Sequence, residues 1–348
     1  AAVDGIWNTI YILMRNQNKF ILLILITHSL CLSQNLFPIL GGQRAGTSVF
    51  TFLNIGVSAR AVGMGESVVA LNQDASSVYY NPATIAQLED TEISVSQVKW
   101  PANINYDYFS LTHRIFKRHH IGVNGGILHM SPMAETTEFY PDGTGNYFSF
   151  QDRFLGLTYG AKMTDRFSFG LTMKHVYENL AGYKMSAVLM DVGTFYWTGY
   201  RSLRFCASLS NFGKQVSPDG SYNKRILDQD SGDEIQETTA YEKFSPPTQF
   251  RIGAAIDPVE SKSNLLTLAV QLNHPVDNAE YIVFGVEYSY LKTLYLRFGH
   301  KFNKYEEDIT YGVGLNLPVG PIILRVDYGY ANFEHLSDPQ RFSIGLTL

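Results

Sequence analysis

The sequence predicts an all-β fold, a fourteen-stranded antiparallel transmembrane β-barrel with an N-terminal segment in its lumen. The first observation is a two-residue alternation of large apolar with small or polar side chains, which recurs from residue 92 to residue 348. The second is the even number of alternating segments, and the third is that long and short connections alternate between them. Together these features are typical of a barrel with both ends on one side of a membrane.

Each segment has one apolar face and one small or polar face. In the last segment Phe342, Ile344 and Leu346 share the first face, whereas Ser343 and Gly345 share the second. The fourteen segments are 92–98, 105–114, 120–129, 152–161, 167–175, 186–197, 203–210, 248–256, 264–273, 281–290, 294–301, 309–317, 322–330 and 341–348.

The connections that follow even-numbered segments are short, whereas the longest loops, 130–151 and 211–247, follow odd-numbered ones. Short periplasmic turns and longer extracellular loops are the rule in outer-membrane barrels. We therefore expect loops 130–151 and 211–247 to be extracellular and the protein to cross a bacterial outer membrane many times.

The alternatives are a water-soluble repeat protein and a soluble β-sandwich, in which bulky side chains face the core and charged ones face water. Here the second face is rich in Gly, Ala, Ser and Thr with a few charges, while the first carries large apolar and aromatic side chains. This arrangement favours an apolar exterior around a polar lumen.

Composition agrees with this interpretation. The chain has 348 residues, 22 Tyr, 22 Phe and 29 Gly, and its net charge of −5 excludes nucleic-acid binding by bulk positive charge. A mean hydropathy of −0.07 is expected where lumen and loop residues dilute the lipid-facing ones.

Residues 1–33 read as upstream residues followed by a secretory signal peptide that begins at Met14. The apolar run after Lys19 is short for a membrane span, and Cys31 and Ser33 occupy the −3 and −1 positions of a cleavage site before Gln34. An uncleaved anchor is the alternative. Leu30 directly before Cys31 argues against lipidation, and cleavage leaves Cys206 alone, without a disulfide partner.

Residues 34–91 lack strand alternation and are expected to form a hatch in the lumen of the barrel, residues 92–348. The runs Ser58–Gly65 (SARAVGMG) and Asp74–Ala83 (DASSVYYNPA) resemble the hatch of the PorV/PorQ family, which belongs to the FadL-like fourteen-stranded barrels. The segments 46–55, 209–213 and 342–346 are similar to the same family. The hatch motif is carried by Arg60, Gly63, Gly65, Asp74, Asn81, Pro82 and Ala83.

The resemblance implies a non-enzymatic role in type IX protein secretion, with binding of cargo C-terminal signal domains and of a translocon barrel. Because the Asn-Pro-Ala step is shared with FadL-like transporters, a transporter of hydrophobic small molecules is the alternative. A cavity opening laterally through the wall would favour transport. A filled lumen with exposed apolar loop tips would favour protein partners.

Charged residues on the small or polar face of the strands are predicted to face the lumen, because an ionised side chain in lipid at mid-depth costs about 2–4 kcal/mol. We expect them to pair with one another or with Arg60, Glu66 and Asp74 of the hatch; a solute path lined by them is the alternative. They are Lys174, Asp191, Arg204, Arg251, Glu287, Arg297, Arg325 and Asp327.

No catalytic, nucleotide-binding or zinc motif is present, and we expect neither an enzyme nor a metal or other cofactor. In loop 211–247 the sequence Asp228–Glu234 resembles a calcium loop, but its glycine is one position too early. A partner-binding loop is the better interpretation, with Tyr222, Ile226, Ile235 and Tyr241 as its apolar contacts.

Overall fold

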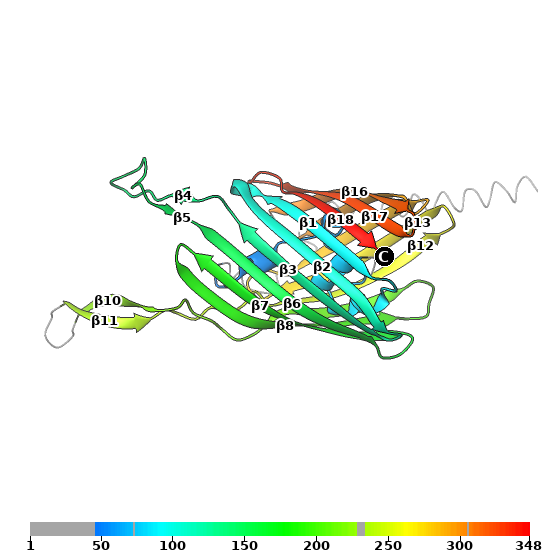
Figure 1. The fold of residues 1–348 in the computed structure, drawn as a ribbon, viewed down its shortest axis with the longest axis horizontal. Coiled ribbons are helices and arrows are strands. Elements are labelled where there is room, and N and C mark those ends of the chain that lie inside the picture. Colours follow the sequence, from blue (N-terminus) through cyan, green and yellow to red (C-terminus); the bar gives the residue numbers. More distant parts are fainter. Residues whose placement is uncertain (1–45, 72–73, 228–233, 305) are drawn as a thin grey trace, which may run out of the picture. The chain divides into compact units, whose positions relative to one another are not determined.

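The computed structural model describes residues 46–71, 74–227, 234–304 and 306–348, and within them fourteen strands close into one antiparallel barrel (Figure 1). The predicted fold class is confirmed. The barrel strands are β1 (Glu92–Trp100), β2 (Ile104–Phe116), β3 (His119–His129), β6 (Phe150–Lys162), β7 (Phe167–Leu180), β8 (Tyr183–Trp197), β9 (Arg204–Phe212), β12 (Gln249–Glu260), β13 (Asn264–Pro275), β14 (Tyr281–Tyr290), β15 (Leu294–Phe302), β16 (Glu307–Val319), β17 (Ile322–Phe333) and β18 (Gln340–Thr347).

Each predicted segment coincides with one of these strands, although several strands run further than the alternation does. β7, for example, continues five residues past its predicted end at His175, to Leu180. Backbone pairing with the neighbouring strand holds these extensions in place, down to Leu180 opposite Tyr183 at the β7–β8 turn. Pairing of β1 with β18, from Glu92 opposite Thr347 to Lys99 opposite Gln340, closes the cylinder.

Four short strands in the two long loops were not predicted. β4 (Met133–Ala134) pairs with β5 (Tyr147–Phe148), and β10 (Ser221–Leu227) pairs with β11 (Glu234–Ala240). Both hairpins extend beyond the long-loop end of the barrel (Figure 1). Their sequences have no single buried face, so the alternation that reveals the barrel strands is missing from them.

The faces of the barrel strands follow the predicted phase. In β18 Phe342 and Ile344 are exposed, whereas Ser343 between them is buried. Leu157 in the middle of β6 is 63% exposed on the outer surface. Such side chains form an apolar belt that lipid tails can cover without the cost of exposing them to water.

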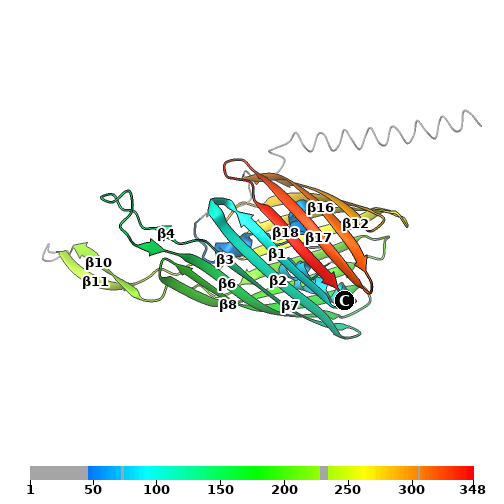
Figure 2. The same cartoon turned by 45° about the horizontal axis from the view of Figure 1, so that its top comes forward.

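The described residues of the range 46–91, here called the N-terminal segment, run inside the barrel (Figure 2). They form four short helices, and a fifth, η4 (Pro101–Asn103), follows β1. Ser58, Asp74 and Asn81 cap three of the four, each accepting a hydrogen bond from a backbone N–H of the first turn. The four helices are η1 (Thr51–Asn54), α2 (Ala59–Gly63), η2 (Ala75–Tyr79) and η3 (Pro82–Gln87).

Glycines let this segment touch the wall backbone to backbone. A Cβ added at Gly312 of β16 would lie 2.9 Å from the Cα atom of Gly63. One added at Gly170 of β7 would lie 2.2 Å from the carbonyl carbon of Pro82. Small residues on both sides therefore set how closely α2 and η3 pack against the strands.

The predicted signal peptide and residues 34–45 lie outside the described residues. Among the described residues, no helix is long and apolar enough to cross a membrane.

Replacing Leu157 with Arg is expected to destabilise the protein by about 2–4 kcal/mol, because it places a charge on the lipid face at mid-depth. The measurement is the free energy of unfolding by urea in lipid vesicles. Phe139→Arg is the control, since Phe139 is 85% exposed in the loop beyond β4. Equal losses in the two variants would contradict the assignment of the lipid-facing belt.

Candidate functional site

The contact between the N-terminal segment and strands β14, β15 and β17 is built on a buried charge network. Arg60 donates from Nε and Nη2 to the two carboxylate oxygens of Glu287, both at 2.8 Å. Arg297 donates from Nε to Glu287 at 2.6 Å and from Nη1 to Asp327 at 2.5 Å. Asp74 lies 3.6 Å from Arg60 and joins the network from within the segment.

Because the network is buried, its charged groups strongly affect one another's pKa. The side chains of Arg60 and Glu287 are 8% and 2% exposed. Burial alone would lower the pKa of Arg60, but the charge of Glu287 raises this pKa above its usual value. Burial alone would raise the pKa of Asp74, but the charges of Arg60 and Arg325 hold it below its usual value. Both groups therefore remain ionised while the segment is in place.

Helix α2 aims Arg60 at the wall. Its cap residue Ser58 accepts from the backbone N–H of Ala61, and the backbone N–H of Ala59 donates to Ser343 Oγ of β18 at 2.9 Å. The helix is thus held at its first turn before the guanidinium reaches Glu287 across the lumen.

A second charge group lies closer to the long-loop end. Lys301 of β15 donates to Glu66 of the segment at 2.9 Å and to Glu307 of β16 at 2.7 Å. Lys304, in the loop between these strands, donates to Glu307 at 3.2 Å. Burial lowers the pKa of Lys304, but the charge of Glu307 outweighs it and leaves the pKa raised.

The Asn-Pro-Ala step anchors the other side of the segment. The side-chain amide of Asn81 donates to the carbonyl oxygens of Val69 at 2.9 Å and Thr194 at 3.1 Å, while its oxygen accepts from the backbone N–H of Ala83 at 3.0 Å. A Cβ at Gly193 of β8 would lie 1.9 Å from that oxygen. One side chain therefore caps η3 and binds it to β8.

All eight charges predicted for the lumen are buried or partly buried on the inner face. Lys174 donates to Asp191 at 2.8 Å, and Arg251 donates to Ser210 at 2.9 Å. The remaining pairs include Arg204 with Asp257 at 2.8 Å and Arg325 with Glu92 at 2.8 Å.

The sequence reading did not single out four of the partners, Glu92, Asp257, Lys301 and Glu307. Lys301 is four residues from Arg297 in β15 and therefore lies on the same inner face. The two-residue alternation could have identified it as a lumen-facing charge. Asp257 lies where the pairing of β12 with β13 shifts register, between Ile256 and Val259. Such an irregularity breaks the two-residue alternation, so the alternation does not predict which face Asp257 is on.

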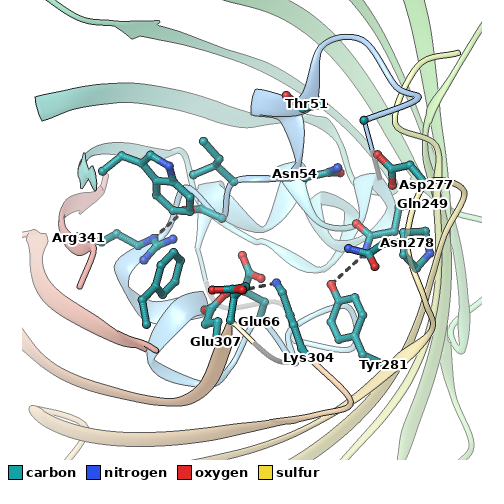
Figure 3. A pocket seen from close by; sticks show the side chains of 17 residues that line it. Thr51, Asn54, Glu66, Gln249, Asp277, Asn278, Tyr281, Lys304, Glu307 and Arg341 are labelled. Carbon is teal, nitrogen blue, oxygen red and sulfur yellow. Dashed lines mark hydrogen bonds and ion pairs between the residues drawn. The ribbon is translucent and has the colours of Figure 1, made fainter. Parts of the chain in front are cut away.

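A cavity of about 380 Å³ lies at the long-loop end of the lumen (Figure 3). Trp100, Phe333 and Arg341 line one part of it, and Gln249 and Tyr281 line another. The guanidinium of Arg341 donates from Nε to the carbonyl oxygen of Gly56 at 2.8 Å and lies 5.6 Å from the centre of the Trp100 ring. The N-terminal segment therefore closes this cavity on the side that faces the interior of the barrel.

The N-terminal segment and the wall share a cluster of aromatic rings, called here the aromatic cluster. Tyr79 packs edge-on against Tyr108 of β2 with ring centres 5.6 Å apart, and Phe154 of β6 lies 6.0 Å from Tyr79. Phe52 contacts Tyr106 and Phe154 at 5.9 Å and 6.4 Å.

Directly outside this cluster the wall is hollowed. A depression of about 550 Å³ is lined by exposed residues such as Phe109, Ile127 and Leu155, and also by the inward residues Tyr108 and Phe154. Gly126 of β3, next to Gly125, lines it as well. A Cβ at Gly126 would come within 2.8 Å of the rings of Tyr106 and Phe154. These glycines bring the lipid-facing hollow and the aromatic cluster to opposite sides of a thin part of the wall.

The predicted partner-binding residues lie around hairpin β10–β11. Tyr222 stacks on Tyr241 at 5.3 Å, and Tyr183 packs edge-on against Tyr241 at 5.6 Å. Ile226 and Ile235 are opposite each other in the hairpin, but their side chains are outside what the structure describes. The residues of the calcium-like loop, 228–233, are also outside it.

The other long loop was missed as a candidate surface. Phe139, Tyr140 and Tyr147 are 85%, 63% and 71% exposed there.

Among the described residues, no group of three or more His, Cys, Asp or Glu side chains is placed to hold a metal ion.

No protein-family model and no curated protein matches the sequence. Solved structures do match in fold. The CymD monoaromatic hydrocarbon channel superimposes with a TM-score of 0.54 at 12% identity, over 84% of this chain and 96% of that one. The Pseudomonas putida toluene transporter TodX gives 0.50 at 13% identity, over 88% and 98%. A Pseudomonas aeruginosa FadL homologue gives 0.48 at 10% identity, over 88% and 99%.

The chain therefore shares its barrel fold with the CymD channel and with TodX.

Arg60 and Glu287 are expected to be coupled by about 1–3 kcal/mol, as contacting residues in a buried network are. The measurement is a double-mutant cycle of Arg60→Met and Glu287→Gln on unfolding in vesicles. The control cycle uses Arg118 and Asp165, an ion pair at 2.9 Å whose side chains are 52% and 92% exposed. A coupling no larger than that of the control would contradict the role of Arg60 as an anchor.

Proposed function

We propose that this protein is an outer-membrane channel for hydrophobic small molecules and that its N-terminal segment is the hatch that closes it. The names of two structures with the same fold, a monoaromatic hydrocarbon channel and a toluene transporter, support this proposal. The fold alone does not carry it, because identities of 12% and 13% relate architecture and not substrates.

The observation that carries the proposal is the hollow at Gly125 and Gly126. An apolar molecule in the membrane meets a depression whose lining includes Tyr108 and Phe154. The same two rings belong to the aromatic cluster that the hatch completes with Tyr79. Aromatic rings of the cluster thus reach the outer depression, whose lining also includes Asp107, Arg153 and His175, and a movement of the rings would open a route from lipid to lumen.

The hatch is suited to be a gate because non-covalent contacts hold it along its length. Charges anchor it to β14 through Arg60 and Glu287 and to β15 through Glu66 and Lys301, and the amide of Asn81 anchors it to β8. We propose transport without chemical conversion, which agrees with the lack of catalytic motifs in the sequence.

A second candidate is the secretion role implied by the PorV/PorQ resemblance, with binding of cargo signal domains and a translocon barrel. None of the three structures named above is described as a secretion component. What favours a protein partner is the exposed aromatic surface of the long loops, above all Phe139, Tyr140 and Tyr147. Exposed aromatic clusters are typical of protein interfaces.

Replacing Gly126 with Ala is expected to reduce toluene uptake several-fold, because the added methyl lies 2.7 Å from the Tyr106 ring and blocks the thin part of the wall. The measurement is accumulation of labelled toluene by cells with an intact outer membrane. Gly345→Ala is the matched control, since its Cβ would have no neighbour nearer than 3.5 Å. Unchanged uptake in Gly126→Ala, at equal amounts of folded barrel, would refute the lateral route.

Deletion of 221–240 tests the second candidate. Ser221 and Ala240 are paired at the base of hairpin β10–β11, so the chain can be rejoined there with little strain. If the hairpin binds a partner, a protein recovered with the full chain from its native membrane should be lost from the deletion variant, while the barrel still inserts and resists SDS without heating. Recovery of the same protein from the variant would exclude the hairpin as its binding site.

A further inference from the structure

Exposed basic residues gather in the short turns at one end of the barrel. The turns that join β2 to β3, β6 to β7, β8 to β9, β12 to β13 and β14 to β15 each have at least one. These turns follow one another around the barrel, because β3 pairs with β6, β7 with β8, β9 with β12 and β13 with β14. The set is called here the basic arc, and its members are Lys117, Arg118, Arg166, Arg201, Lys262 and Lys292.

Hydrogen bonds join each of these turns to the next and hold the basic arc in place. Three of the bonds run between backbone groups, and in the fourth a backbone N–H donates to a side-chain hydroxyl. The donor and acceptor residues are Lys162 with Arg118 at 2.9 Å, Trp197 with Arg166 at 2.8 Å, Leu291 with Ser263 at 2.7 Å, and Asp257 with Ser202 Oγ at 2.7 Å. The charges of the arc are therefore carried on a fixed rim.

Three residues of this rim have a left-handed backbone conformation. The φ angles of Arg201, Leu291 and Lys292 are 49°, 54° and 53°. Asparagine and glycine adopt this conformation at lower cost and are the usual residues of tight hairpin turns. The turns thus keep long basic and apolar side chains where smaller residues would be less strained.

Few negative charges neutralise the basic arc. Among the described residues, Arg118 is its one side chain in an ion pair, with Asp165 at 2.9 Å, and both side chains are largely exposed. At the other end of the barrel, loop 130–151 has three acidic residues and no Lys or Arg. The net charge of −5 therefore conceals a basic end, whose field attracts anions.

Large apolar side chains stand beside the charges of the arc. In three of the five turns an apolar residue directly precedes a basic one, in the pairs Phe116 with Lys117, Tyr200 with Arg201, and Leu291 with Lys292. The apolar members are 67%, 63% and 53% exposed. A phospholipid offers the matching arrangement, acyl chains next to an anionic phosphate, whereas a soluble anion would not contact the apolar residues.

We propose that the short-turn end of this barrel binds anionic phospholipids. The basic arc holds the head-group phosphates, and Phe116, Tyr200 and Leu291 contact the adjoining acyl chains. The lipids lie along the arc from β2 to β15, because the β16–β17 turn has no charged residue and the acidic residues Glu89 and Asp90 precede β1. This inference does not depend on the proposed transport function.

Native mass spectrometry of the full chain tests the selectivity. The protein is released from micelles that contain equal amounts of phosphatidylglycerol and phosphatidylcholine with the same acyl chains. Several-fold more phosphatidylglycerol than phosphatidylcholine is expected to stay bound, because each basic residue near an anionic lipid strengthens binding by about fivefold. Equal retention of the two lipids would overturn the proposal.

Removal of charge from the arc tests its position. The arc variant combines Lys117→Gln, Arg166→Gln, Arg201→Gln and Lys292→Gln, and it should retain the two lipids equally. Resistance to SDS without heating shows whether the variant is folded. If it is not, Arg166→Gln and Lys292→Gln are measured singly, and each should lower the preference for phosphatidylglycerol by a smaller factor. A preference that persists in folded variants would exclude the arc as the binding surface.

The control variant removes the same charge from exposed sites at the long-loop end, and it should keep the preference of the unmodified protein. Its substitutions are Lys184→Gln, Lys214→Gln, Lys224→Gln and Lys243→Gln. Loss of the preference in this variant would place the lipids at the wrong end of the barrel and refute the proposal.

Two further measurements identify what the arc holds. Leu291→Ser should weaken retention of both lipids and leave their ratio unchanged, since Leu291 contacts acyl chains; unchanged retention would contradict that contact. Inorganic phosphate should displace phosphatidylglycerol no better than sodium chloride of the same ionic strength. Stronger displacement would mean a site for soluble phosphate and would overturn the lipid as its occupant.

Discussion

The bidentate pair of Arg60 and Glu287 is the contact on which the interior of this barrel depends. A charge that faces lipid at mid-depth is costly, so many charged residues of the strands, Glu287, Arg297 and Asp327 among them, face the lumen. A narrow lumen cannot hydrate all of them, and each unpaired buried charge would be strongly destabilising. Arg60 enters from the N-terminal segment, bridges to Glu287 and shares it with Arg297. The wall is thereby neutralised by a segment that does not belong to the sheet.

This dependence explains what could be predicted from the sequence and what could not. The two-residue period predicts that the side chains of Glu287, Arg297 and Asp327 face the lumen, since a charge that faces lipid at mid-depth is costly whatever its partner. Their pairing with Arg60 does not follow, because it depends on where a segment without periodicity crosses the lumen. The same holds for Lys301 with Glu66, 235 positions apart in the chain. The hairpins of the long loops escaped prediction for a different reason, because no buried face imposes a pattern on them.

Three sides of the N-terminal segment differ in how they are bound to the wall. Toward β14, β15 and β17 the contacts are charge-assisted and buried, the class of hydrogen bond that is strongest in proteins. Toward β8, Asn81 supplies neutral hydrogen bonds to a backbone carbonyl and caps η3 at the same time. Toward β1, β2 and β3 the contact is made by aromatic rings and by neutral hydrogen bonds, from Ser96 to the carbonyl oxygen of Val57 at 2.7 Å and between His120 and the carbonyl oxygen of Leu88 at 2.8 Å. The strongest contacts of the N-terminal segment therefore lie on the side of the charge network.

A gate that must open without losing its place requires such an asymmetry. If every side were fixed by buried ion pairs, movement would expose several charges at once and the lumen would stay shut. If no side were fixed by buried ion pairs, the segment would leave the barrel and the charged residues of the wall would lose their partners. The thin part of the wall at Gly125 and Gly126 lies on the weakly bound side, next to the aromatic cluster. In the proposed channel, entry from the membrane and the rings that move therefore share one side, and the charge network across the lumen keeps the proposed hatch anchored.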